Sequence, residues 1–226
     1  ELDGSEFTYG LEKIGVPDLR SKHPELTGKG ITVGIIDTGI DASHAEFKNK
    51  EILFKDFINN KNGAYDDNGH GTHVAGTISG VGAGGTQIGI APEVKLVIAK
   101  VFTAQGSGSL SAILRAMEWM GNPAAEADGK SRPKVVNNSW GGGIGDNVNE
   151  DPFFQATLTW VQLEIFPCFA AGNEGPGAST VGSPGGLPPA FAIGATDSND
   201  GVASFSSRGP VEIKYNGKSV KYVKPD

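Results

Sequence analysis

Three polar residues stand at places in the sequence where a side chain could take part in catalysis. Asp37 follows the apolar run 31–36, His70 lies between two glycines in DDNGHGTHVAG, and Asn173 follows the apolar segment FPCFAAG. An Asp paired with a His can activate a nucleophile, and an Asn amide can donate a hydrogen bond to an oxyanion. Taken alone, Asp37 and Asn173 are also typical turn residues, so the prediction depends on the three segments together.

The histidines and the single cysteine allow other interpretations. His70 and His73 are three residues apart and could share a helix face as metal ligands. Zinc proteases with such a pair carry a Glu next to the first His, and no Glu lies between these two. We therefore expect His73, deeper in the helix, to be a hydrogen-bonded structural residue. Cys168 lies in an apolar run and is expected in the core rather than as a nucleophile.

The order of these motifs resembles that of the subtilisin-like serine proteases, the subtilases. Asp37 stands in DTG, His70 in HGTHVAG and Asn173 in AAGNEG, and the match covers nearly the whole chain. The segments NNSWGGG, IFP and FSSRGP are most similar to the bacillopeptidase F branch. The resemblance implies a secreted serine endopeptidase in which Asp37 orients His70, His70 transfers protons and Asn173 donates to the oxyanion.

The nucleophile of that family is missing from these residues. The resemblance places it in a GTSMA motif beyond a KPD segment, and this chain ends at KPD, residues 224–226. We expect residues 1–226 to be the N-terminal portion of one catalytic domain, a processed or engineered piece that is inactive alone. The serine would then lie in a complementary chain of a nicked enzyme, in an unrecorded part of the sequence, or in a parent protein of a true fragment. The alternative is a catalytically dead module that only binds a peptide or a partner; the intact Asp37, His70 and Asn173 favour the enzyme.

Two glycine-rich segments are expected to hold a protein or peptide substrate. The resemblance assigns residues 106–108 and 139–141 to two edges that pair with an extended substrate backbone. It also implies a wide primary pocket for a large apolar side chain, with Glu174 at its rim to accept a basic one, and an apolar pocket for the P4 residue. The expected substrate-binding residues are Gly106, Ser107, Gly108, Leu110, Ile113, Ser139, Trp140, Gly141, Glu174, Thr180, Val181 and Gly182.

A structural calcium ion is a further expectation from the resemblance. The segment 81–87 has the length of the family's calcium loop, and Glu46 takes the place of its usual carboxylate. Ala83 stands where that loop normally offers an Asn oxygen, and calcium requires six or more oxygen ligands. The expected ligands are Glu46, Val81, Gly85 and Gln87.

Short β-branched runs alternate with helical patterns along the chain, which predicts how these residues are positioned. Strands are expected at 31–36, 95–101, 135–137, 166–171 and 191–195, and helices at 71–80, 110–120 and 152–163. This alternation predicts an α/β fold, a doubly wound, mostly parallel sheet between two helical layers, with the C-terminal part of the subtilisin-like domain missing. Ligands of such sheets bind beyond the carboxyl ends of the strands, where Asp37 and Asn173 are expected.

Composition excludes several classes of function. The formal net charge of −7 disfavours a nucleic-acid partner, and no apolar run approaches the ~18 residues that cross a membrane. A single cysteine excludes an internal disulfide framework. The partners that the resemblance implies are a protein or peptide substrate, the chain that carries the serine, and a pro-segment or inhibitor.

Overall fold

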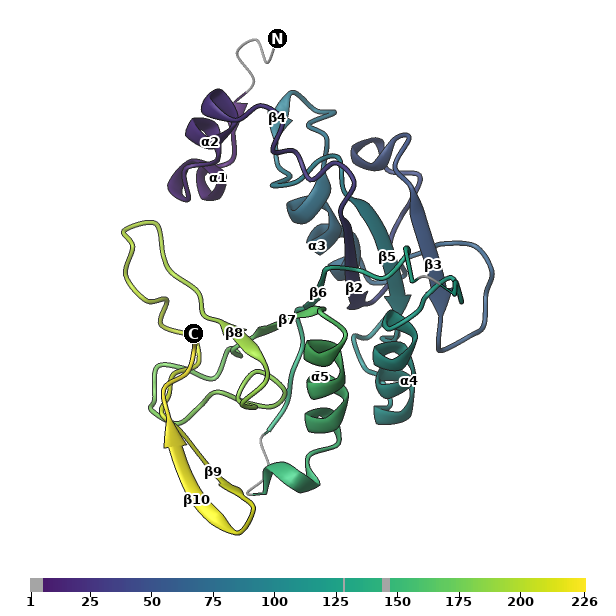
Figure 1. The fold of residues 1–226 in the computed structure, drawn as a ribbon. Coiled ribbons are helices and arrows are strands. Elements are labelled where there is room, and N and C mark those ends of the chain that lie inside the picture. Colours follow the sequence, from purple (N-terminus) through teal and green to yellow (C-terminus); the bar gives the residue numbers. More distant parts are fainter. Residues whose placement is uncertain (1–5, 128, 144–146) are drawn as a thin grey trace.

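A six-stranded parallel sheet forms the centre of the computed structural model, which describes residues 6–127, 129–143 and 147–226 (Figure 1). The strand order is β3-β5-β2-β6-β7-β8, and every neighbouring pair is parallel. The strands are β2 (Thr32–Asp37), β3 (Ile52–Asp56), β5 (Lys95–Lys100), β6 (Val135–Asn138), β7 (Phe166–Ala170) and β8 (Phe191–Ile193).

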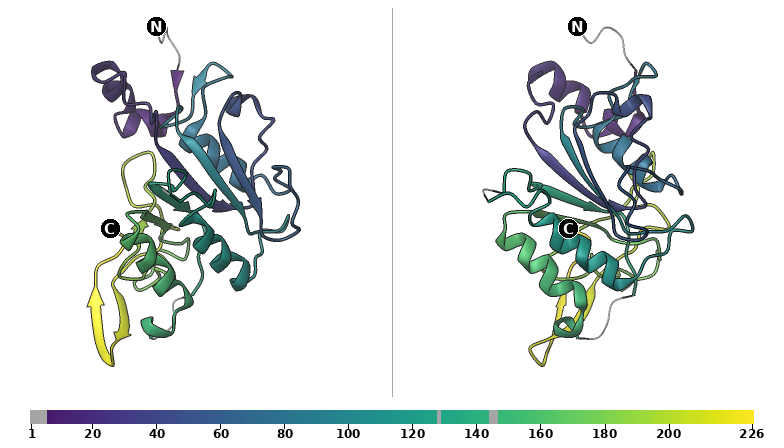
Figure 2. Two further views of the ribbon diagram at one scale, coloured as in Figure 1. Left: turned by 45° about the vertical axis from the view of Figure 1, so that its right-hand side comes forward. Right: turned by 90° about the vertical axis from the view of Figure 1, so that its right-hand side faces the viewer.

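Helices cover both faces of this sheet. Successive strand residues point to opposite faces, and Ile35 packs in one core cluster with Ala75 of α3 (His70–Ser79). Ile36 packs in a second cluster with residues of α4 (Leu110–Met120) and α5 (Pro152–Gln162). The two latter helices lie side by side (Figure 2), joined by a 2.8 Å hydrogen bond from Trp160 Nε1 to the carbonyl of Met117. The predicted three-layer α/β fold is therefore confirmed.

The helix starts follow from their capping residues. The Asp151 carboxylate accepts the N–H of Phe153, and Pro152 occupies the first helical position of α5, as the sequence predicts. At the start of α4, the Ser109 hydroxyl accepts the N–H of Ala112. The helix α4 has the predicted bounds, and α3 and α5 differ from theirs by one residue at their ends.

Several short elements were not predicted. The N-terminal part forms β1 (Glu6–Phe7), α1 (Tyr9–Lys13) and α2 (Val16–Lys22), and β1 pairs with β4 (Thr86–Gln87). Two 3₁₀ turns, Ala45–Phe47 and Val148–Glu150, lie between larger elements. Near the C-terminal end, β9 (Val211–Tyr215) and β10 (Lys218–Tyr222) form an antiparallel hairpin that projects away from the sheet in Figure 1.

All parallel strands end at the same edge of the sheet, which is where the predicted site belongs. Asp37 is the last residue of β2, Lys100 of β5 and Ala170 of β7. Within the described part of the chain, no helix has the length and apolar character that a membrane span requires.

Candidate active site

Asp37 and His70 form a hydrogen-bonded pair at this edge. The Nδ1 atom of His70 lies 2.8 Å from Oδ1 and 3.0 Å from Oδ2 of Asp37. The Asp37 side chain is 1% exposed, whereas that of His70 is 51% exposed. A carboxylate facing Nδ1 keeps the proton on that nitrogen, so Nε2 is left to accept a proton from another group.

The environment of Asp37 acts on its pKa in two directions. Burial raises the pKa of the carboxyl above its usual value, because the charged form loses solvation. The hydrogen bonds from His70 and from the N–H of Thr38, at 2.7 Å, act the other way without cancelling the effect of burial. The pair is therefore a buried carboxylate held by an accessible imidazole.

His70 is the first residue of α3, and Asp66 fixes the start of that helix. One oxygen of Asp66 accepts the N–H groups of Asn68 and Gly69, and the other accepts the N–H and the hydroxyl of Thr72. Burial alone would raise the pKa of Asp66, but these hydrogen bonds outweigh it and lower the pKa to about 2. Asp66 supplies the cap that Gly69, the N-cap residue without a side chain, lacks.

The glycines beside His70 have two different roles. Gly69 has a φ of 102°, a conformation that side chains rarely adopt. A Cβ at Gly71 would lie 2.3 Å from the carbonyl oxygen of Gly39, so only glycine lets α3 approach the segment after β2 this closely. The N–H of Gly71 also donates to the Thr38 hydroxyl at 2.8 Å. The small residues therefore bring His70 to the end of the strand that carries Asp37.

A cavity of about 540 Å³ opens in front of the pair. His70 lines it together with Asn173, which follows β7 on the other side. The cavity collects most of the expected substrate-binding residues: Gly106, Gly108, Ile113, Ser139, Trp140, Gly141, Glu174 and Gly182. Both expected backbone edges, 106–108 and 139–141, are thus brought to the same hollow as the pair.

Four expected substrate-binding residues do not line this cavity. Val181 is 2% exposed and packs in the core that α4 and α5 share. The Thr180 hydroxyl accepts the N–H of Arg208, and Leu110 points outward with 47% exposure. Ser107 contributes a turn, with its carbonyl accepting the N–H of Thr103.

Sequence reasoning predicted Trp140 in the wall but missed the two aromatic residues that pack against it, Phe102 and Phe153. The ring of Trp140 lies 6.1 Å from that of Phe102 and 5.5 Å from that of Phe153, and all three line the cavity. Phe102 comes two residues after β5 ends, so its place at the carboxyl edge was a signal that could have identified it. The wall therefore offers a large apolar surface to a ligand.

Glu174 lies at the cavity, but its carboxylate already has a partner. One oxygen accepts the hydroxyl of Ser207 at 2.8 Å, and the same hydroxyl accepts the N–H of Glu174 at 3.0 Å. Glu174 is exposed, so the carboxylate keeps acceptor capacity toward the cavity.

The carboxylate of Glu46 is engaged by backbone amides of the loop expected to bind calcium. Glu46 is 8% exposed, and its carboxylate accepts the N–H of Gly82 at 2.7 Å and that of Gly84 at 3.4 Å. The loop 81–87, which contains Val81, Gly85 and Gln87, thus directs donors toward the carboxylate, whereas calcium needs oxygens directed at it. The described residues contain no cluster of three or more His, Cys, Asp or Glu suited to a metal. Calcium remains an untested prediction, and this geometry argues against it.

The interpretation of His73 as a hydrogen-bonded structural residue is wrong for the described residues. Its side chain is exposed, makes no hydrogen bond within them, and lines a second cavity of about 1000 Å³ together with Tyr9 and Ile14. His73 lies on the face of α3 that points away from the sheet, so no core group reaches it. Cys168 is half-buried, and burial raises the pKa of its thiol, which fits a packing role.

Comparisons with known proteins agree with this geometry. The sequence pattern of the Subtilase family matches residues 28–224. Serine protease AprX of Bacillus subtilis (strain 168) is 41% identical over 201 residues, which cover 82% of this chain and 44% of that protein. Subtilisin-like protease 6 of Trichophyton rubrum is 38% identical over 234 residues, covering 96% of this chain and 52% of its own length.

The chain thus spans about half the length of the curated relatives it matches. Neither relative carries the bacillopeptidase F name, so that narrower resemblance stays a prediction. The relatives are named as proteases, which supports a proteolytic function. By the match over most of its length and the motif order around Asp37, His70 and Asn173, the chain belongs to the subtilase family.

Proposed function

We propose that this chain supplies the Asp, the His and the oxyanion donor of a secreted serine endopeptidase, whose nucleophile lies outside residues 1–226. The observation that carries the proposal is the Asp37–His70 pair, with Nδ1 2.8 Å from a buried carboxylate and the imidazole accessible. A serine hydroxyl that reaches Nε2 would pass its proton to His70 as it attacks the scissile carbonyl. His70 would then return the proton to the leaving amine.

Asn173, which lines the same cavity as His70, also supports the proposal. The Asn side chain carries an amide that can donate to the oxygen of a tetrahedral intermediate, and Asn173 lines the cavity together with His70. An extended peptide between the edges 106–108 and 139–141 would place its scissile carbonyl between His70 and Asn173. The aromatic wall around Trp140 favours large apolar side chains in the adjoining pocket.

The source of the serine is the part of the proposal that needs its own test. No serine in the described part of the chain has a hydrogen bond to the His70 ring; the cavity-lining Ser139 hydroxyl instead accepts the amide of Asn137 at 2.9 Å. We therefore propose a complementary C-terminal segment, on the same or on a separate chain, as the donor of the nucleophile. A pro-segment or an inhibitor could occupy the same cavity before or after catalysis.

A serine-reactive fluorophosphonate probe tests this directly. The purified full protein is labelled, denatured and digested, and the labelled peptide is identified by mass spectrometry. We expect one labelled serine outside residues 1–226, and no label in a His70→Ala protein. A folded protein without label, or with label on a serine within 1–226, would contradict the proposal; the former result favours a peptide-binding module without activity.

A further inference from the structure

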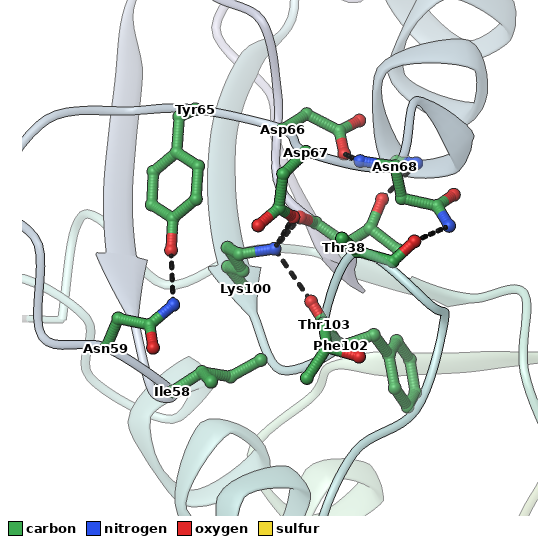
Figure 3. Close-up of polar contacts among 12 residues, drawn as sticks. Thr38, Ile58, Asn59, Tyr65, Asp66, Asp67, Asn68, Lys100, Phe102 and Thr103 are labelled. Carbon is green, nitrogen blue, oxygen red and sulfur yellow. Dashed lines mark hydrogen bonds and ion pairs between the residues drawn. The ribbon is translucent and has the colours of Figure 1, made fainter.

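Lys100 is a buried lysine beside the catalytic pair. It ends β5, and its side chain is 0% exposed. A buried ammonium is unfavourable unless its donors are satisfied. Its Nζ donates to the carbonyl of Thr38 at 2.6 Å, to the carbonyl of Phe102 at 2.7 Å and to Oδ1 of Asp67 at 2.6 Å (Figure 3). All three donors of the ammonium are therefore used.

These three acceptors belong to the three segments that build the site. Thr38 directly follows Asp37, and Asp67 lies three residues before His70. Phe102 lines the cavity and leads to the substrate edge 106–108. A single Nζ atom thus joins the strand of the acid, the loop of the base and the start of a cavity wall.

The backbone hydrogen bonds between β2 and β5 place Lys100 directly beside Asp37. Asp37 and Lys100 are direct partners in the parallel register of β2 and β5. The N–H groups of Val101 and Phe102 both donate to the carbonyl of Asp37, at 2.9 Å and 3.3 Å. Lys100 holds the next carbonyl, that of Thr38, so the segment 100–102 fixes the carbonyls of two successive residues, Asp37 and Thr38.

The groups around the ammonium compensate its charge. Asp67 is the only carboxylate that contacts Nζ within the described residues, and its side chain is 40% exposed. The ring of Tyr65 lies 4.9 Å from Nζ, and the hydroxyl of Tyr65 donates to Oδ2 of Asp56 at 2.8 Å. Tyr65 also lies in the loop that leads to His70. The charge of Lys100 therefore organises this loop as well as the end of β2.

We propose that Lys100 is a positioning residue that sets the separation and orientation of Asp37 and His70. This inference rests on the proposed proteolytic function, because its main consequence is a change in turnover. A small displacement of a catalytic group can lower a rate by as much as about 100-fold. Lys100 touches no substrate; it acts through the Thr38 carbonyl and the Asp67 carboxylate.

The experiment compares Lys100→Met, Asp67→Ala and the double variant in the full protein with its serine. Active sites are titrated with the serine-reactive probe, so that turnover refers to correctly folded enzyme. We expect Lys100→Met to lower kcat per titrated site by roughly 10- to 100-fold, with KM for a peptide substrate changed less than about 3-fold. Asp67→Ala should lower kcat by a smaller factor. Lys95→Met is the matched control, because Lys95 begins the same strand but makes an exposed ion pair with Glu51.

The double variant separates positioning from stability. In Lys100→Met the Asp67 carboxylate loses its counter-charge, so part of the loss in thermal stability should be relieved when Asp67→Ala is added. If positioning is the role of Lys100, the melting temperature rises in the double variant while kcat stays low. Recovery of kcat together with the melting temperature would overturn the proposal, and so would normal turnover per site in Lys100→Met or in Asp67→Ala.

A spectroscopic signal tests the inference independently of activity. The Nδ1 proton of His70, hydrogen-bonded to a carboxylate, is expected as a far-downfield proton resonance in the NMR spectrum of the full protein. It should shift or disappear in Lys100→Met and in Asp67→Ala, and stay in place in Lys95→Met. An unchanged resonance in the first two variants would overturn the inference. A wild-type protein that shows this resonance but neither cleaves peptides nor takes the label would instead refute the proposed function. The effect of Lys100→Met on the resonance would still test the positioning role of Lys100.

Discussion

At the scale of single residues, the proposed mechanism depends on the one imidazole that meets a buried carboxylate. His70→Ala in the full enzyme should lower kcat by several orders of magnitude with little change in KM, because the proton acceptor is lost while the cavity stays intact. The measurement is steady-state kinetics on a peptide substrate. His23→Ala is a suitable control, since His23 is exposed and its nearest acid is Glu25 at 3.4 Å. A loss confined to KM would contradict the role of His70.

The three motifs taken together, with their resemblance to the subtilases, predicted Asp37, His70 and Asn173, whereas no motif predicted Lys100. Asp37, His70 and Asn173 stand in short motifs whose glycines and turn residues indicate an unusual backbone conformation. Lys100 ends an apolar strand, where a lysine usually marks the return to solvent. Its burial depends on a tertiary arrangement, the loop 65–69 folding over the strand end, which no local pattern encodes. His73 is the opposite case. Its position in the helix suggested a structural role, but the side chain is exposed, since helix position alone does not decide exposure.

At the scale of elements, the start of α3 is where pH should act on stability. The folded-state pKa of Asp66, about 2, lies below its ordinary value of 3.8. Asp66 therefore adds stability that is fully present above about pH 4 and is lost as the pH falls toward 2. Asp66→Asn should lower the melting temperature at pH 7, and the difference from wild type should shrink between about pH 4 and pH 2. The measurement is a set of melting curves across this range, with the exposed Asp18→Asn as control. A difference between Asp66→Asn and wild type that stays constant with pH would show that the charge of the cap does not contribute.

The close contact between α3 and β2 makes a second prediction at this scale. A Cβ at position 71 would meet the Gly39 carbonyl at 2.3 Å, so Gly71→Ala forces the helix away from the segment that follows β2. We expect a loss of about 1–3 kcal/mol in the free energy of unfolding, measured by urea denaturation. Gly63→Ala is the matched control, because no atom lies within 4 Å of its added Cβ. Equal stability of both variants would show that the helix can shift without strain.

The elements that sequence reasoning found and missed differ in length and burial. The apolar strands β2 and β5 are bounded by clear turn signals and were predicted to within one residue at either end. The edge strand β3 has alternating exposure, and the segment EILFKD around it carries three charged residues, so its sequence resembles a loop. The β9–β10 hairpin did carry a signal, since Asn216 and Gly217 both have positive φ and Asn-Gly is a preferred hairpin turn.

At the scale of the whole molecule, the arrangement around Glu46 bears on how stability is maintained. The carboxylate binds the amides of Gly82 and Gly84 itself, so removal of calcium by a chelator should leave the melting temperature of the protein unchanged. Glu46→Ala should lower it and should speed cleavage of the loop 81–87 by an added protease, because the amides of Gly82 and Gly84 lose the acceptor that holds the loop. A clear drop in melting temperature on chelation, reversed by added calcium, would instead establish the ion that the resemblance implies.

The proposed catalytic groups and the cavity wall come from two different parts of the chain. The proposed acid and base and the lysine that joins them all come from residues 37–102, whereas the proposed oxyanion donor and much of the cavity wall come from residues 139–183. In the proposed enzyme, substitutions in the cavity wall of the later stretch, Asn173 apart, would alter which peptides bind while leaving the Asp37–His70 pair unchanged. Related enzymes could therefore come to prefer different substrates while keeping the same catalytic pair.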